Sequence, residues 1–252
     1  MTPSPLDETS LRRAVRILAR RDPDLAQIAR THGPPPLWGR EPGFATLVHL
    51  ILEQQVSLAS ARAAFDRLRA TLPVFEPAHF LKLDDATLKR VGFSRQKTRY
   101  ARELANAVAS KTLDLERLAQ LDDEQVHAHL TRITGIGAWT SNVYLLMVLR
   151  RPDAFPTGDI ALLTAAQRVK RLRKRPTPER LEKLAEPWRP WRAVAARLLW
   201  HFYLSEKEVA RNGAHKPRTP NPASSPQDLK PLTRRIGGNR RGAKRGRRAT
   251  DA

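Results

Sequence analysis

The stretch Leu130–Trp139, LTRITGIGAW, carries the clearest structural signal in this chain. Two helix-forming segments flank a short turn that has glycines at positions 135 and 137. Glycine adopts positive φ readily and lets another backbone approach closely. The helix after the turn is predicted to begin at Ala138, so its first N–H groups would have no intrahelical partner and would point outward. Such a turn is suited to hold a phosphate oxygen, although an ordinary helical hairpin has the same pattern.

A turn of this kind grips a nucleic-acid backbone and reads no base sequence. We expect the contacts to come from the turn and from the helix that follows it. The candidate phosphate-binding residues are therefore Gly135, Ile136, Gly137 and Thr140.

Helical spacing of apolar residues continues on both sides of the turn, for example at Leu11, Val15 and Leu18. Several segments are preceded by a residue whose side chain can cap a helix, and these are Ser57, Asp84, Ser94, Asp122 and Asp159. No alternating strand of useful length is found. The sequence therefore predicts an all-α fold with helices joined by short loops.

The chain has 252 residues, which suits one domain or two small ones. We expect two helical lobes with a cleft between them. Residues 44–152 would form the lobe with the helix-hairpin-helix, and the N-terminal helices in residues 1–43 would pack with residues 153–212 to form the other. Residues 213–252 are predicted to be a disordered basic tail, because Pro, Gly, Ser, Arg and Lys dominate there.

The net charge of +21 indicates a polyanionic partner, and nucleic acid fits better than a membrane. Twelve Lys or Arg and two Asp fall in residues 211–252. The tail would attract phosphates without sequence preference, and a spacer with no further duty is the alternative.

Composition excludes several kinds of chemistry. The chain has no cysteine, so disulfides, zinc–thiolate sites and thiol nucleophiles are ruled out. The seven histidines show no metal-binding spacing, and His49 is expected in the core. No signal peptide is recognisable, and the longest apolar run, Val143–Leu149, is too short to span a membrane. We expect a cytoplasmic monomer, associated with the nucleoid if the source is bacterial, that needs no cofactor and no metal.

A second informative segment is Asp153–Leu163, DAFPTGDIALL. Asp159 follows a Pro-Thr-Gly turn and opens an apolar helix, which is the ordinary position of an N-cap. A carboxylate at this position lies at the positive end of the helix dipole, which favours its ionised form. If it also faced a cleft, it could stabilise a cation that forms during a reaction.

The two segments together resemble the helix-hairpin-helix DNA glycosylase superfamily, in its 3-methyladenine DNA glycosylase II branch. The resemblance covers roughly residues 44–205. Four blocks occur in the family's order, and they are Ile51–Ala64, Val91–Ala105, residues 133–162 and Pro190–Leu204. The N-terminal sheet domain of some members is not found in this chain.

The resemblance implies that Asp159 is the catalytic residue. The family flips a damaged nucleotide out of duplex DNA and hydrolyses its N-glycosidic bond during base excision repair. The branch implies alkylated purines such as 3-methyladenine and 7-methylguanine as substrates. A positively charged alkylated base is already a good leaving group, so one carboxylate beside the sugar would suffice.

In the bifunctional branches of the superfamily a lysine at the position of Trp139 forms a Schiff base with the sugar. An indole cannot attack, so the resemblance implies a monofunctional enzyme. Trp139 and Trp200 would line the base pocket, and a place in the core is the alternative for both. Some relatives have a pocket tyrosine where this chain has Val143, while the adjacent Tyr144 should face elsewhere on the helix.

The resemblance also implies a DNA wedge, which fills the gap left by the flipped nucleotide. Gln55 is the favoured wedge residue and Gln54 the second candidate, unless both are plain surface amides.

Ser94, Arg95 and Lys97 open a helix with a hydroxyl, N–H groups and cations, which suits a second phosphate contact or merely a solvated helix start. The run Lys170–Arg175, KRLRKR, is expected to be a solvated face or another backbone contact.

Two rival functions stay open. The chain would otherwise be a glycosylase for oxidised or deaminated bases, or a noncatalytic helix-hairpin-helix DNA-binding protein. A carboxylate in the cleft argues against pure DNA binding, because a polyanion gains nothing from it. The carbonyl groups of the hairpin could also hold a monovalent cation.

Overall fold

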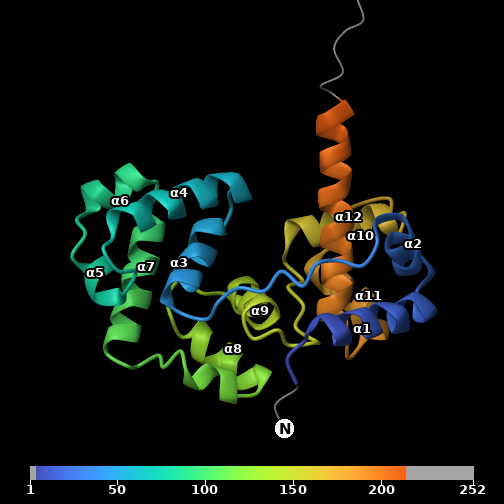
Figure 1. Cartoon of the computed structure of the whole chain (residues 1–252), viewed down its shortest axis with the longest axis horizontal. Helices are drawn as coiled ribbons and strands as arrows, with labels where there is room; N and C mark the ends of the chain where they lie inside the picture. Colours follow the sequence, from blue (N-terminus) through green and yellow to red (C-terminus); the bar gives the residue numbers. More distant parts are fainter. Residues whose placement is uncertain (1–3, 214–252) are drawn as a thin grey trace, which may run out of the picture. The chain divides into compact units, whose positions relative to one another are not determined.

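The structure is a computed structural model that describes residues 4–213, and every regular element in this range is helical (Figure 1). The elements in chain order are α1 (Glu8–Arg21), α2 (Pro23–His32), α3 (Phe44–Glu53), α4 (Leu58–Thr71), α5 (Pro77–Leu81), α6 (Asp85–Val91), α7 (Arg95–Ala109), the 3₁₀ helix η1 (Arg117–Gln120), α8 (Asp123–Thr131), α9 (Ala138–Met147), α10 (Ile160–Val169), α11 (Pro178–Ala185), the 3₁₀ helix η2 (Glu186–Trp188) and α12 (Arg192–Gly213). The all-α prediction is confirmed for this part of the chain.

The capping residues decide where the helices begin. Each of the five predicted caps accepts a backbone N–H from the first turn of its helix, as expected for Ser57, Asp84, Ser94, Asp122 and Asp159. Two short helices, α5 and α11, were not predicted. Their lengths of 5 and 8 residues are too short for a helical period to stand out, and a proline at the first turn is their main signal.

The helices pack in two groups. Helices α3 to α7 pack on one another, and α9 packs on α3 and on α8. In the second group α1 and α2 pack on α12, which also holds α10. The N-terminal helices therefore join the C-terminal ones across the sequence, and α9 is the helix that leads from one group to the other (Figure 1).

Arg197 of α12 ties the groups together from inside the core. Its guanidinium is fully buried and donates to the carbonyl oxygens of Leu37, Ala193 and Leu146 at 2.8, 3.1 and 2.8 Å. Leu146 lies in the last turn of α9, where a cation also meets the negative end of the helix dipole. Burial lowers the pKa of Arg197 to about 10, so the group stays charged at neutral pH.

Replacing Arg197 by Met is expected to lower the free energy of unfolding by about 2–4 kcal/mol, because the carbonyls of Leu37 and Leu146 lose their donor inside the core. Relief of the buried charge offsets part of this loss. Denaturant unfolding would measure it, with the exposed Arg12→Met as the matched control. Equal stability of the two variants would contradict the role given to Arg197.

The predicted basic tail lies outside the described residues, apart from the end of α12. Within residues 4–213 no helix combines the length and the apolar character needed to cross a lipid bilayer. His49 is half-buried and stacks on Phe65 with ring centroids 4.4 Å apart, in line with its expected place in the core. Tyr144 is completely buried, and burial raises the pKa of its phenol to about 12.

Candidate active site

Asp159 lies where three helices meet. Its Oδ1 accepts the backbone N–H of Leu162 at 2.9 Å, which caps α10. The same oxygen accepts the indole N–H of Trp200 from α12 at 3.0 Å, and Oδ2 accepts the indole N–H of Trp139 from α9 at 3.0 Å. All three partners are donors, and none could accept a proton from a neutral carboxyl group. The site therefore suits a carboxylate that only accepts hydrogen bonds.

The carboxylate is held without being sealed inside. Asp159 is half-buried, and both its sequence neighbours, Gly158 and Ile160, are exposed. The side chain of Ile160 is 64% exposed, which is unusual for a large apolar residue. The capping role and a chemical role of Asp159 are thus compatible, because the cap uses one oxygen and leaves the group beside open surface.

Both tryptophans contact the carboxylate directly. Each turns its N–H edge toward Asp159, so both position the carboxylate. Trp200 is only 8% exposed and belongs largely to the core, whereas Trp139 is half-buried and keeps part of its ring accessible. The base-pocket role of the two tryptophans stays a prediction. Val143 is buried, as is its neighbour Tyr144.

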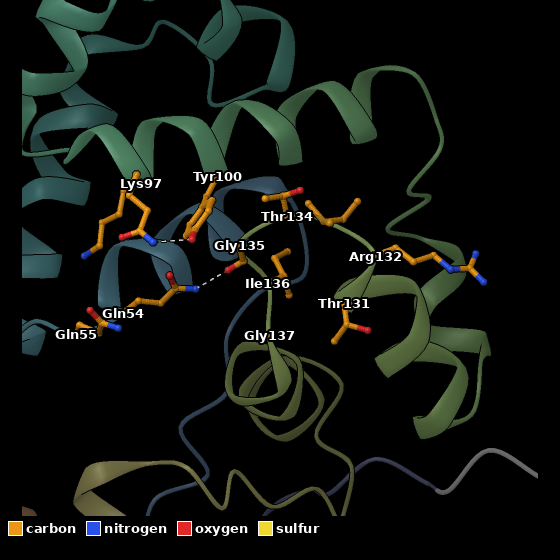
Figure 2. A pocket seen from close by; sticks show the side chains of 12 residues that line it. Gln54, Gln55, Lys97, Tyr100, Thr131, Arg132, Thr134, Gly135, Ile136 and Gly137 are labelled. Atoms are coloured by element: carbon orange, nitrogen blue, oxygen red, sulfur yellow. Dashed lines mark hydrogen bonds between the residues drawn. The ribbon is translucent and has the colours of Figure 1, made fainter.

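The turn before α9 has the geometry that its glycines predict (Figure 2). Gly135 has φ +93°, and a Cβ there would overlap the ring of Tyr100. Gly137 is exposed and precedes α9 with no side-chain cap, so the first N–H groups of that helix are left for an outside acceptor. The N–H of Ile136 donates to the Ile133 carbonyl and its side chain is buried, so Ile136 supports the turn, and its phosphate contact stays a prediction.

Gln54 is held against the hairpin. Its Nε2 donates to the carbonyl oxygen of Gly135 at 2.8 Å (Figure 2). It also donates to Oγ1 of Thr140 at 3.0 Å. These contacts leave Gln54 unsuited to enter the duplex as a wedge. Thr140 is buried, so its side chain is not available to phosphate and only its backbone N–H remains a candidate donor.

Gln55 is exposed and has φ +57° in the turn between α3 and α4. For a residue other than glycine this conformation is uncommon, and it turns the side chain away from the neighbouring Gln54 (Figure 2). Of the two candidates, Gln55 therefore stays the predicted wedge residue.

The start of α7 supplies the second set of candidate phosphate contacts. Ser94 caps the helix by accepting the N–H of Lys97, and Arg95 is exposed. Lys97 is half-buried, and its ammonium donates to the Leu52 carbonyl at 2.7 Å. Burial lowers the pKa of Lys97. Its ammonium thus caps the end of α3, and any phosphate contact would use its remaining N–H bonds.

A hollow of about 460 Å³ lies beside the hairpin, lined by Gln54, Gln55, Gln96, Lys97, Tyr100 and residues 131–137 (Figure 2). It does not include Asp159, Trp139 or Trp200. This hollow is therefore a different place from the predicted cleft that would hold those three side chains. Sequence reasoning also missed Gln96, whose Nε2 donates to the hydroxyl of Tyr100 at 2.6 Å and steadies the ring against Gly135.

Lys170 does not belong to a solvated face, although this was expected for the basic run Lys170–Arg175. Its Nζ lies 2.7 Å from both carboxylate oxygens of Asp22, and the indole of Trp188 donates to Asp22 as well. Burial raises the pKa of Asp22, but these hydrogen bonds outweigh it and the pKa is lowered overall. The sequence did not predict this ion pair, because its two residues are 148 positions apart. Arg173, Lys174 and Arg175 are exposed as predicted.

A set of three or more histidine or carboxylate side chains close enough to hold a metal ion is not found within residues 4–213. The site consists of one carboxylate, indole and backbone donors, and a helix N-terminus beside a glycine turn. Fold and site together define an all-helical protein with a glycine turn between two helices and a carboxylate held by N–H donors.

The chain belongs to the HhH-GPD superfamily of base excision DNA repair proteins, whose match extends over residues 48–190. A DNA-3-methyladenine glycosylase of Bacillus subtilis is 27% identical over 195 residues, which is 73% of this chain and 64% of that protein. The chain therefore spans slightly less than two thirds of that relative.

Solved structures agree in fold. The 3-methyladenine DNA glycosylase Mag1 of Schizosaccharomyces pombe, in complex with abasic DNA, has a TM-score of 0.70 and 26% identity, covering 75% of this chain and 95% of Mag1. A DNA-3-methyladenine glycosidase of Bacillus halodurans has a TM-score of 0.64 and 27% identity, covering 77% of this chain and 91% of the other. The resemblance to this branch that the sequence motifs indicate is thus confirmed.

Proposed function

We propose that this protein is a monofunctional DNA glycosylase that hydrolyses the N-glycosidic bond of alkylated purines in damaged duplex DNA. The observation that carries the proposal is the carboxylate of Asp159, held by three N–H donors beside open surface. The relatives named 3-methyladenine glycosylases support alkylated bases as the substrate class.

The reaction needs water and one carboxylate. The bond between C1′ and the base nitrogen breaks, and its electron pair leaves with the base. The sugar becomes positive, and the carboxylate of Asp159 lowers the energy of that state. Water adds to C1′ and gives up a proton, for which Asp159 is the nearby acceptor. An alkylated purine cation leaves as a neutral base, so no acid is required to protonate it, and the proposal includes no cofactor.

The remaining residues would hold the DNA. The N–H groups after Gly137 contact a backbone phosphate, and those at the start of α7 contact a second one. Gln55 fills the gap left by the flipped nucleotide. The basic charge of the chain supports attraction to the duplex, and a single protein molecule carries all of these elements.

The absence of lyase activity is testable by borohydride trapping on DNA with a damaged base. Trp139 occupies the position of the Schiff-base lysine, and both half-buried lysines with a resolved contact, Lys97 and Lys170, are bonded away from Asp159. We therefore expect no covalent protein–DNA adduct. A trapped adduct would contradict monofunctional hydrolysis.

The substrate class is tested by incubating the full chain with methylated duplex DNA and identifying released bases by chromatography. We expect 3-methyladenine and 7-methylguanine to appear. Release from an oxidised-guanine duplex but not from methylated DNA would favour the oxidised-base rival. Binding to both duplexes without any release would favour a noncatalytic DNA-binding protein.

A further inference from the structure

Helix α1 carries a row of arginines that the proposed reaction does not use. Arg12, Arg16 and Arg20 follow one another at i, i+4 and i+8, and Arg13 lies beside them. All four are exposed, while Leu11, Ala14, Val15 and Leu18 bury the opposite side of the helix. These arginines therefore form one continuous face of α1, which we name the α1 ridge.

The ridge is not neutralised by neighbouring acids. Among residues 4–213, no carboxylate forms an ion pair with any of its four arginines, whereas exposed cations elsewhere do pair, as Arg62 does with Asp66. Like charges at i, i+4 repel one another on a helix surface, so the row is unfavourable for the isolated protein. An anionic partner would remove that repulsion.

The ridge is remote from the proposed DNA contacts. The hairpin lies at the N-terminus of α9 and Asp159 at the N-terminus of α10. Helix α1 is attached at the other ends of both helices. The N–H of Leu6, just before α1, donates to the carbonyl of Arg150, just after α9, at 2.8 Å, and Asp22, just after α1, binds Lys170 at the end of α10.

Each of these two helices has 10 residues and is thus about 15 Å long. A duplex held at the N-termini of α9 and α10 would therefore lie a helix length away from the attachment points of α1. Residues 173–175 are exposed cations that follow Lys170, the residue that binds Asp22. They add positive charge on the side of the protein where α1 is attached.

We propose that the α1 ridge is a second DNA-binding surface that takes the phosphate backbone of another duplex segment while the first occupies the hairpin and Asp159. Guanidinium groups spaced one helical turn apart suit phosphates, which they bind through paired N–H donors. The ridge would let the protein pass directly from one duplex to another. This inference rests on the proposed function only for the position of the first duplex.

The test uses the full chain and a triple variant, Arg12→Gln, Arg16→Gln and Arg20→Gln. The matched control removes three exposed cations from the other helix group, as Arg69→Gln, Lys82→Gln and Lys89→Gln. Each protein is loaded on a short fluorescent duplex with an abasic site, and unlabelled duplex is added at rising concentration. Release from wild type and control should accelerate several-fold as competitor rises, whereas release from the ridge variant should stay constant.

Two further measurements separate the outcomes. The salt slope of binding to a second duplex should fall in the ridge variant by about 0.9 for each phosphate that the variant no longer neutralises. Base release from methylated duplex DNA should be unchanged in the ridge variant, so a failure of the proposed function shows independently as an absence of base release by wild type.

If competitor duplex accelerates release equally from the ridge variant and from wild type, or does not accelerate it from wild type, the proposed second DNA-binding surface is refuted. Weaker affinity for the short duplex would place the ridge in the first DNA site instead. Acceleration by polyglutamate as strong as by DNA would assign the ridge to an acidic protein partner and equally refute the proposal.

Discussion

Asp159→Asn is expected to lower the single-turnover rate of base release from methylated duplex DNA by about 10²–10³-fold or more, the size of effect seen when a group that stabilises transition-state charge is removed. The amide has no charge to oppose a positive sugar and cannot accept a proton from water. DNA binding should survive or tighten, because a negative charge near the backbone is gone.

The geometry supplies a control for this variant. An Asn side chain can keep one oxygen toward Leu162 and Trp200, but its NH₂ would then face the indole N–H of Trp139, and two donors would meet. Trp139→Phe removes that donor, keeps an aromatic though smaller ring and leaves the carboxylate charged. It should therefore reduce the rate much less than Asp159→Asn does. Full activity of Asp159→Asn would refute the catalytic role, and equal loss in both variants would reduce Asp159 to a structural cap.

Gly135→Ala is expected to damage both the fold of the hairpin and its hold on DNA. Residue 135 has φ +93°, which an alanine adopts only with strain, and the new Cβ would overlap the Tyr100 ring. We expect a loss of about 2–4 kcal/mol in the free energy of unfolding, from the backbone strain and the steric overlap together. Affinity for duplex DNA should fall with it, since the N–H groups of α9 are aimed by this turn.

Denaturant unfolding and DNA titration would be measured on the same preparations. Gly39→Ala is the matched control, because its added Cβ meets nothing within 4 Å. Adding Tyr100→Ala to Gly135→Ala should restore part of the stability by removing the overlap, while the strain at φ +93° persists. If Gly135→Ala behaves like Gly39→Ala, the close packing of Tyr100 on the hairpin does not govern this site.

Local signals in the sequence were sufficient for much of the fold. Caps such as Ser57 and Asp122 act within three residues of themselves, so their effect is readable without any tertiary contact. The glycine turn and the N-cap Asp159 belong to the same kind of signal. The contacts of Gln54 could not be predicted, because its partners, Gly135 and Thr140, lie more than 80 positions away along the chain.

The amino-acid sequence alone thus determined most of the helices and the hairpin turn, since periodicity and capping are properties of neighbouring residues. The family resemblance of the motifs implied Asp159 as the acidic site residue. Only the tertiary structure decided how Asp159 is held. The indoles of Trp139 and Trp200 come from two other helices, and nothing in their spacing says that their N–H edges rather than their faces meet the carboxylate. The same holds for Lys170 with Asp22 and for the remote side of α1, because hydrogen bonds between distant segments depend on how the helices pack.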